Sequence, residues 1–249
     1  MLPAGFGLGI AMAVLVGVAV IVAWVGRLGH SRAALTASVR AVIQLAVVAL
    51  ILAAVVDSWL LTAGFVMVMY AAASVTAGRR MTQSREAAWA AVPVVASTLP
   101  VLVALLVTGV LPAQALAVIP VAGILIGGAM TATALAGRRA LDDLRTRRGE
   151  VEAALSLGLL PRDAVLEICR PAASSALVPV TDQTRTVGLV TLPGAFVGML
   201  LGGASPVQAG AVQLFVLVAL LAVETVAVVV TIELVARGHL TRQDQFAGS

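Results

Sequence analysis

The sequence contains no lysine, a single cysteine and two histidines, and only 11% of its 249 residues are charged. A P-loop uses lysine to reach the β- and γ-phosphates of a nucleotide, so the absence of lysine excludes a Walker A motif of the usual kind. Cys169 alone cannot form an intrachain disulfide, and the sequence shows no Cys and His cluster at metal-ligand spacing. We therefore expect no ATPase site and no bound cofactor in this chain.

Apolar residues make up 61% of the sequence and the mean hydropathy is +1.08, values outside the range of soluble globular proteins. A helix needs about 20 apolar residues to cross the hydrocarbon core of a membrane. The sequence therefore predicts an all-α integral membrane protein that forms one permease domain over residues 1–249. Seven stretches qualify as spans, at residues 4–25, 39–56, 58–77, 89–111, 115–136, 187–203 and 211–236.

The positive charge is unevenly distributed between the spans. All sixteen basic residues other than histidine are arginines, and the second, fourth and sixth connections carry none of them. Because positive charge collects on the cytoplasmic side, this pattern predicts an N-terminus outside and a cytoplasmic C-terminus. The pI near 10.9 then reflects membrane topology, and no nucleic-acid partner is expected. The arginines lie in the first connection (Arg27, Arg32, Arg40), the third (Arg79, Arg80, Arg85), the fifth (Arg138 to Arg185) and the tail.

The only long connection, residues 137–186, contains an amphipathic stretch. Val151, Ala154 and Leu155 fall on one helical face. Gly158 and Pro161 then predict a bend and the start of a second short helix, reaching about Cys169. Two interpretations fit: an interfacial helix that anchors the bundle, or a cytoplasmic elbow between the fifth and sixth spans that docks into a groove of a soluble partner.

The spacing within this stretch resembles a motif of ABC importer permeases. That motif is Glu-Ala-Ala, three residues, Gly, nine residues, Ile, one residue, a variable position often occupied by Leu, and Pro. The chain matches the spacing and carries Arg170 before the proline. The resemblance implies that the stretch is a coupling helix, which fits a cleft on a separate ATPase subunit and transmits its closure to the spans. The coupling residues it predicts are Glu152, Ala153, Ala154, Gly158, Pro161, Ile168 and Pro171.

Three further motifs resemble the FetB-type permeases, a family associated with bacterial iron export and, in plants, with aluminium tolerance. They are RAVIQL at 40–45, IPVAGILIGGAM at 119–130 and TDQTRTVGLVTLPG at 181–194, of which the last is the most specific. The family often has Asn where Gly128 stands, and a Met pair where this chain has Ala195 and Phe196. The resemblance implies a homodimer in the bacterial inner membrane, with ATP and magnesium bound by a partner P-loop ATPase, that exports iron or another metal.

Polar residues within the spans are the candidates for a translocation pathway. Glu224 lies near the middle of the last span, where a charge costs about 2.5–3.5 kcal/mol and usually faces a cavity, a partner or a proton. The alternative is a protonated Glu224 that hydrogen-bonds to a neighbouring helix, with Gln44 or Thr225 as candidate partners. Gln44, in the second span, needs a partner or water in any case.

The remaining pathway candidates are thioethers and one charged pair. Met130 and Met199 can offer soft contacts to a metal, although methionine in an apolar span usually serves packing. Asp182 and Arg185, three residues apart, can pair at the cytoplasmic mouth, and their place in the 181–194 motif supports a role. No set of metal ligands is legible from the sequence.

Glycines recur every four residues in two of the expected spans. This spacing leaves one helix face without side chains, which permits either tight packing or a moving surface in a gated pathway. The glycines are Gly123 and Gly127 in the fifth span and Gly194, Gly198 and Gly202 in the sixth.

Two other classes of function compete with an ABC permease. A proton-coupled secondary transporter would use Glu224 and would work without ATP or the elbow. The sequence shows no internal repeat of the kind such transporters often have. A membrane scaffold without a transported substrate would need neither Glu224 nor the glycine faces.

Overall fold

The computed structural model describes residues 6–55, 58–82 and 84–241, and its regular elements in these ranges are all helices, as expected. The chain forms two compact units that divide after Asp57. Six helical segments in the described ranges are long and apolar enough to cross a membrane. They are α1 (Phe6–Val25), α2 (Ser31–Val55), α3 (Trp59–Met81), η1 with α4 (Arg85–Ala90 and Ala91–Val107), α5 (Ala115–Thr146) and α10 (Pro206–Ala236).

The first unit is a hairpin of α1 and α2. Arg27 and Gly29, both at positive φ, form the tight turn between the two helices. Most side chains of the hairpin are exposed, because α1 and α2 bury only part of their surface against each other. Gln44 is exposed on α2. The expected spans at 4–25 and 39–56 correspond to α1 and α2 over their described residues.

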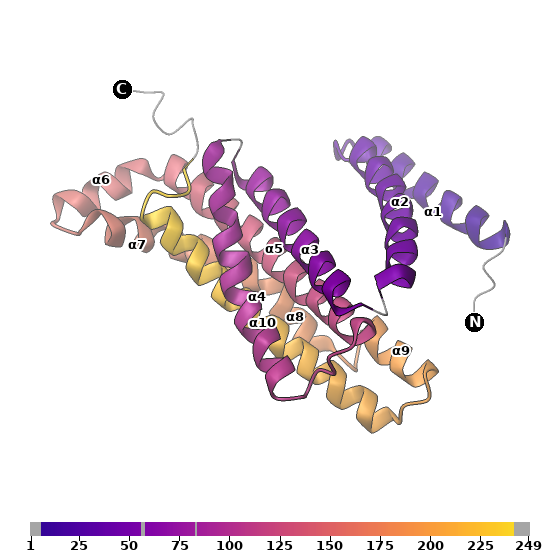
Figure 1. Cartoon of the computed structure of the whole chain (residues 1–249). Helices are drawn as coiled ribbons and strands as arrows, with labels where there is room; N and C mark the ends of the chain where they lie inside the picture. Colours follow the sequence, from indigo (N-terminus) through magenta and orange to yellow (C-terminus); the bar gives the residue numbers. More distant parts are fainter. Residues whose placement is uncertain (1–5, 56–57, 83, 242–249) are drawn as a thin grey trace. The chain divides into compact units, whose positions relative to one another are not determined.

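The second unit is a bundle built around the long helices α3, α4, α5 and α10 (Figure 1). Ala87, just before α4, packs against Gly78 of α3, and the hydroxyl of Thr98 donates to the Tyr70 hydroxyl at 2.8 Å, so α4 runs antiparallel to α3. Gly137 of α5 packs against both Met81 of α3 and Thr231 of α10. The C-terminal ends of α3, α5 and α10 therefore meet at one end of the bundle, which we call the arginine end because Arg79, Arg138 and Arg237 lie there.

The chain returns between α5 and α10 through a broken segment. It consists of η2 (Ser175–Leu177), α8 (Val178–Thr186), a turn, and α9 (Gly194–Leu201). Leu177 lines a cavity with Thr225 and Val228, whereas Phe196 lies beside Gly210. The segment therefore runs antiparallel along α10, from beside the middle of that helix toward its N-terminus.

The expected sixth span at 187–203 is wrong as a continuous helix. Residues 187–193 form a turn, in which the Gly188 amide donates to the Thr191 carbonyl at 2.9 Å. The helix that follows has only eight residues and extends about 12 Å, well short of the hydrocarbon core. The apolar stretch predicted as one span thus consists of the turn after α8 and of α9.

Close packing in the bundle depends on glycine at a few positions, and Gly78 gives a direct test. A Cβ at Gly78 would lie 2.3 Å from the Ala87 carbonyl oxygen, which is backbone and cannot move aside. We expect Gly78→Ala to destabilise the protein by about 1–3 kcal/mol. Gly64→Ala in the same helix meets no atom within 4 Å and should leave stability equal or higher. Thermal unfolding in detergent compares the two, and equal midpoints would contradict this packing.

Candidate functional site

The predicted elbow is present at the arginine end of the bundle (Figure 1). Helix α6 (Arg148–Ser156) is followed by a bend at Gly158, whose φ is +91°, and by α7 (Pro161–Ser174). Pro161 occupies the first turn of α7, where its missing amide hydrogen leaves no hydrogen bond unmade. The helix, bend and helix expected from the sequence are confirmed, and α7 runs five residues beyond the expected end. We use the word elbow for residues 148–174.

The two helices of the elbow differ in burial. α6 has no buried residue, whereas α7 buries Leu166, Ile168 and Cys169 against the bundle. The Cys169 thiol donates to the Ala140 carbonyl of α5 at 3.5 Å, and burial raises its pKa to about 12. Cys169 is therefore a protonated packing residue, and α7 anchors the elbow while α6 projects from it.

The predicted coupling residues are divided between these two roles. Glu152, Ala153 and Gly158 are exposed at the tip, and Glu152 pairs with Arg148 at 3.0 Å. Ala154 is half-buried, Pro161 is exposed, and Pro171 lies exposed inside α7. Ile168 is buried, which indicates a packing role.

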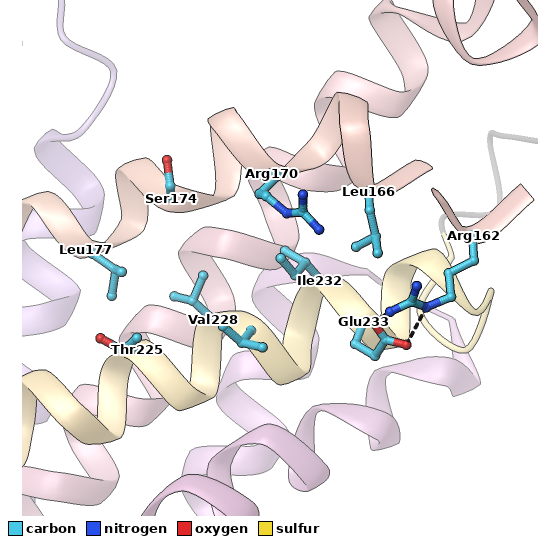
Figure 2. A pocket seen from close by; sticks show the side chains of 10 residues that line it. Arg162, Leu166, Arg170, Ser174, Leu177, Thr225, Val228, Ile232 and Glu233 are labelled. Atoms are coloured by element: carbon cyan, nitrogen blue, oxygen red, sulfur yellow. Dashed lines mark hydrogen bonds and ion pairs between the residues drawn. The ribbon is translucent and has the colours of Figure 1, made fainter. Parts of the chain in front are cut away.

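An ionic clamp joins the elbow to the end of α10 (Figure 2). Arg162 donates to both carboxylate oxygens of Glu233, with its Nε at 2.8 Å from Oε1 and its Nη2 at 2.7 Å from Oε2. The Nε of Arg237 donates to Glu233 Oε1 at 2.7 Å. Bidentate pairing fixes orientation as well as distance, so α7 and α10 are held in one register. Sequence reasoning missed this clamp because 71 residues separate Arg162 from Glu233.

The end of α5 also holds the elbow. Arg147 donates to the Ile168 carbonyl at 3.5 Å, and Arg139 donates to the hydroxyl of Ser175, the residue that directly follows the elbow. Arg147 further pairs with Glu150 of α6, and this hydrogen bond holds the pKa of Glu150 below its usual range. Movement of the elbow would therefore act directly on the two longest helices of the bundle, α5 and α10.

Glu224 faces α5 from the middle part of α10. The residue is buried, with 9% of its surface exposed, and a Cβ on Gly128 would lie 2.8 Å from its Oε1. The hydroxyl of Thr225, one of its expected partners, instead donates to the Leu221 carbonyl of the same helix at 2.7 Å. The other, Gln44, belongs to the hairpin unit. Within the described part of the bundle, Glu224 makes no hydrogen bond or ion pair.

Asp182 and Arg185 pair on α8, at 3.9 Å, with 61% and 79% of their side-chain surfaces exposed. Their position differs from the expected cytoplasmic mouth. Residues before α8 lie beside Thr225, and Val187 just after it lines a cavity with Gln213 and Leu217. The pair therefore lies alongside the middle of α10, within the length that crosses a membrane.

The two methionines proposed for the pathway lie in different surroundings. Met130 of α5 is half-buried and packs against hydrophobic residues of the bundle core. Met199 of α9 lines an apolar cavity of about 870 Å³ between α5, α9 and α10. Met130 is not among the residues that line this cavity, so the structure gives the two methionines no shared site.

The regularly spaced glycines do not form a packing face in this structure. A Cβ added to Gly194 or Gly198 would meet no atom within 4 Å, whereas a Cβ added to Gly123 would lie 3.1 Å from the Cε of Met69. On α5 the closest approaches are made by Gly128 and Gly137 instead. Spacing alone did not identify them, because the contact depends on which side of α5 the other helices cover.

Gln213 is a functional candidate that the sequence reasoning missed. Its side chain is buried, and its Oε1 has no hydrogen-bond partner among the described residues. It lines a cavity of about 290 Å³ with Gly188, Pro193 and Phe196, at the break between α8 and α9. The signal available in the sequence was an amide inside an otherwise apolar span. No group of three or more His, Cys, Asp or Glu residues that could hold a metal ion occurs in the described ranges.

Comparison of the sequence with known proteins identifies a family and several relatives. The model of a family described as "Uncharacterised protein family (UPF0014)" matches residues 7–240. The chain is 37% identical to the UPF0014 membrane protein STAR2 of rice over 87% of its own length and 77% of that protein. It is 36% identical to the protein ALUMINUM SENSITIVE 3 of Arabidopsis thaliana, over 72% of this chain and 66% of that protein.

A bacterial relative carries a functional name. The probable iron export permease protein FetB of Escherichia coli is 31% identical over 144 residues, which are 58% of this chain and 56% of FetB. No solved structure shows a significant match to the chain. The family match thus covers both units of the chain, and the relatives include plant and bacterial proteins.

Proposed function

The chain belongs to the UPF0014 family and is similar to a probable iron export permease, and we propose that it is the permease subunit of an ABC transporter. A separate P-loop ATPase docks on the elbow, and the substrate is iron or another metal. The elbow carries this proposal. It presents an exposed α6 and an exposed bend, while α7 is fixed to α5 and α10.

In this proposal the elbow is mechanically coupled to α5 and α10. Force applied to the exposed tip of α6 reaches α10 through the bidentate Arg162 and Glu233 pair, and reaches α5 through Arg139 and Arg147. α10 carries Glu224, which packs against Gly128 of α5. ATPase closure can therefore change the contact between α5 and α10.

The broken segment supports the seven-span topology in a modified form. α3, α5 and α10 run toward the arginine end, whereas α4 and the broken segment run away from it. Counted as a crossing, the segment 175–201 gives five crossings in the bundle, and α1 and α2 add two. With the arginine end in the cytoplasm, this arrangement has an outside N-terminus and a cytoplasmic C-terminus.

A homodimer encloses the pathway in this proposal. The exposed Asp182 and Arg185 lie at a depth where lipid would leave their charges without water, so they need a water-filled space or a partner. The turn at 187–193 needs the same protection, because irregular backbone is not tolerated against lipid. Two copies facing each other across α8 and α9 meet both needs and form a route lined by the 181–194 motif.

Metal export rests on what the relatives are called. FetB of Escherichia coli is named as a probable iron export permease, and an Arabidopsis relative is named for sensitivity to aluminium. We extend export of a metal ion to this chain, in the inner membrane of a bacterium, with ATP and magnesium bound on the partner subunit.

Transport by purified components tests this function. The permease and its ATPase are reconstituted into vesicles with the ATP-binding side outward, and uptake of Fe²⁺ is measured. We expect uptake that requires both ATP and the ATPase subunit. Uptake by the permease alone that follows an imposed pH gradient would instead support the secondary transporter that uses Glu224.

A further inference from the structure

A cavity of about 400 Å³ lies between α7 and α10, beside the clamp (Figure 2). Its lining changes along its length. Arg162 and Glu233 lie at the arginine end, Arg170 lies between Leu166 and Ser174, and Leu177, Thr225 and Val228 lie toward the middle of the bundle (Figure 2). The charged side chains thus lie toward the arginine end, and the other end is largely apolar, with the hydroxyls of Ser174 and Thr225 among its side chains.

Arg170 is the uncompensated charge of this cavity. In the clamp region, Arg162 and Arg237 are balanced by Glu233 and Asp163, with which they pair. Arg170 makes no hydrogen bond or ion pair in the part of the chain that the structure describes. Figure 2 shows its guanidinium directed into the space between α7 and α10. Glu167 lies on the same helix, but it forms no ion pair with Arg170 in the described chain.

The depth of the cavity fits the edge of a membrane. Glu233 lies in the last turn of α10, near the interface, and Thr225 lies eight residues deeper, about 12 Å along the helix. A ligand that follows the cavity therefore passes from the level of phosphate groups into the hydrocarbon. Val229 is 56% exposed beside this path, so the apolar end is open to lipid from the side.

We propose that this cavity binds an anionic phospholipid, with its phosphate on Arg170 and an acyl chain along Val228 and Val229. Basic pockets between membrane helices on the cytoplasmic side suit anionic head groups. A soluble anion would use Arg170 but would gain nothing from the apolar end. The lipid would occupy the space between the elbow and α10, and so would stabilise the position of α7 that the clamp sets.

Native mass spectrometry of the delipidated full-length protein tests the site. The probes are dioleoylphosphatidylglycerol and dioleoylphosphatidylcholine, added separately in detergent. We expect the anionic lipid to bind about fivefold more strongly, which matches one arginine near a membrane surface. Arg170→Gln should abolish the preference and Arg170→Lys should restore most of it. Arg145→Gln, which removes an exposed arginine elsewhere at the arginine end, should leave it unchanged.

A second variant and a second ligand separate the alternatives. Val229→Trp fills the apolar end and should weaken binding of both lipids without affecting Arg170. A preference that survives in Arg170→Gln, or that is lost equally in Arg145→Gln, would overturn the proposal. Glycerol 3-phosphate that displaces the lipid would show a site for soluble phosphates instead. Dissociation of a dimer by Arg170→Gln would show that a second copy, and not lipid, covers the cavity.

Discussion

We expect the Gly158→Val variant to lose ATP-driven transport while its helical bundle remains folded. Gly158 has a φ of +91°, a conformation that costs a residue with a side chain about 1–3 kcal/mol. A Cβ there would meet no atom within 4 Å, so the effect acts through backbone conformation and not through a clash. Because the bend is exposed, it can refold locally and redirect α6, which would remove the surface that the ATPase contacts.

Gly149→Val is the matched control for this variant. Gly149 lies in α6, has helical backbone geometry and also meets no atom within 4 Å when given a Cβ. ATPase stimulation, metal uptake and the thermal unfolding midpoint should be measured for both variants. Normal coupled uptake by Gly158→Val would reject the elbow as the coupling element. Equal loss in both variants would show that bulk on the elbow matters and that the bend does not.

The Glu224→Gln variant should transport at least about tenfold more slowly, while its stability stays equal or rises. The amide has nearly the shape of the carboxylate, so the contact with Gly128 is kept. A neutral amide also costs less to bury than a charge, which removes a penalty on folding. The loss should therefore appear in metal uptake and in its dependence on pH, and not in the unfolding midpoint.

Glu167→Gln provides the control for Glu224→Gln. It makes the same chemical change on an exposed residue of α7 and should alter neither uptake nor stability. A Glu224→Gln protein with normal uptake and a lowered unfolding midpoint would assign Glu224 a structural role. Loss of uptake without loss of ATPase stimulation would place the defect in the pathway and leave coupling intact.

Local signals in the sequence were sufficient to predict the elbow. Gly158 and Pro161 determine the backbone conformation at their own positions. The helical spacing of apolar residues in α6 and α7 can be recognised within each helix alone. The six long helices were predictable for the same reason, since length and composition decide whether a helix can cross a membrane.

Features that depend on contacts between distant residues were not predictable in this way. The break at residues 187–193 is hidden in an apolar stretch, and only its position beside α10 shows that α8 and α9 follow that helix as two separate pieces. The clamp between Arg162 and Glu233 requires α7 to lie against α10. Gly128 could be recognised only once Glu224 was known to face it.

The central claim is that an ATPase docks on the exposed half of the elbow, and co-purification tests it most directly. The tagged protein is extracted gently from its native membranes, as is a form in which residues 150–160 are replaced by a flexible linker. This replacement spares the clamp and the buried residues of α7. We predict that a P-loop ATPase accompanies the intact protein in equal amount and is absent from the linker form. An ATPase that stays bound to the linker form, or no ATPase with either, would contradict the account.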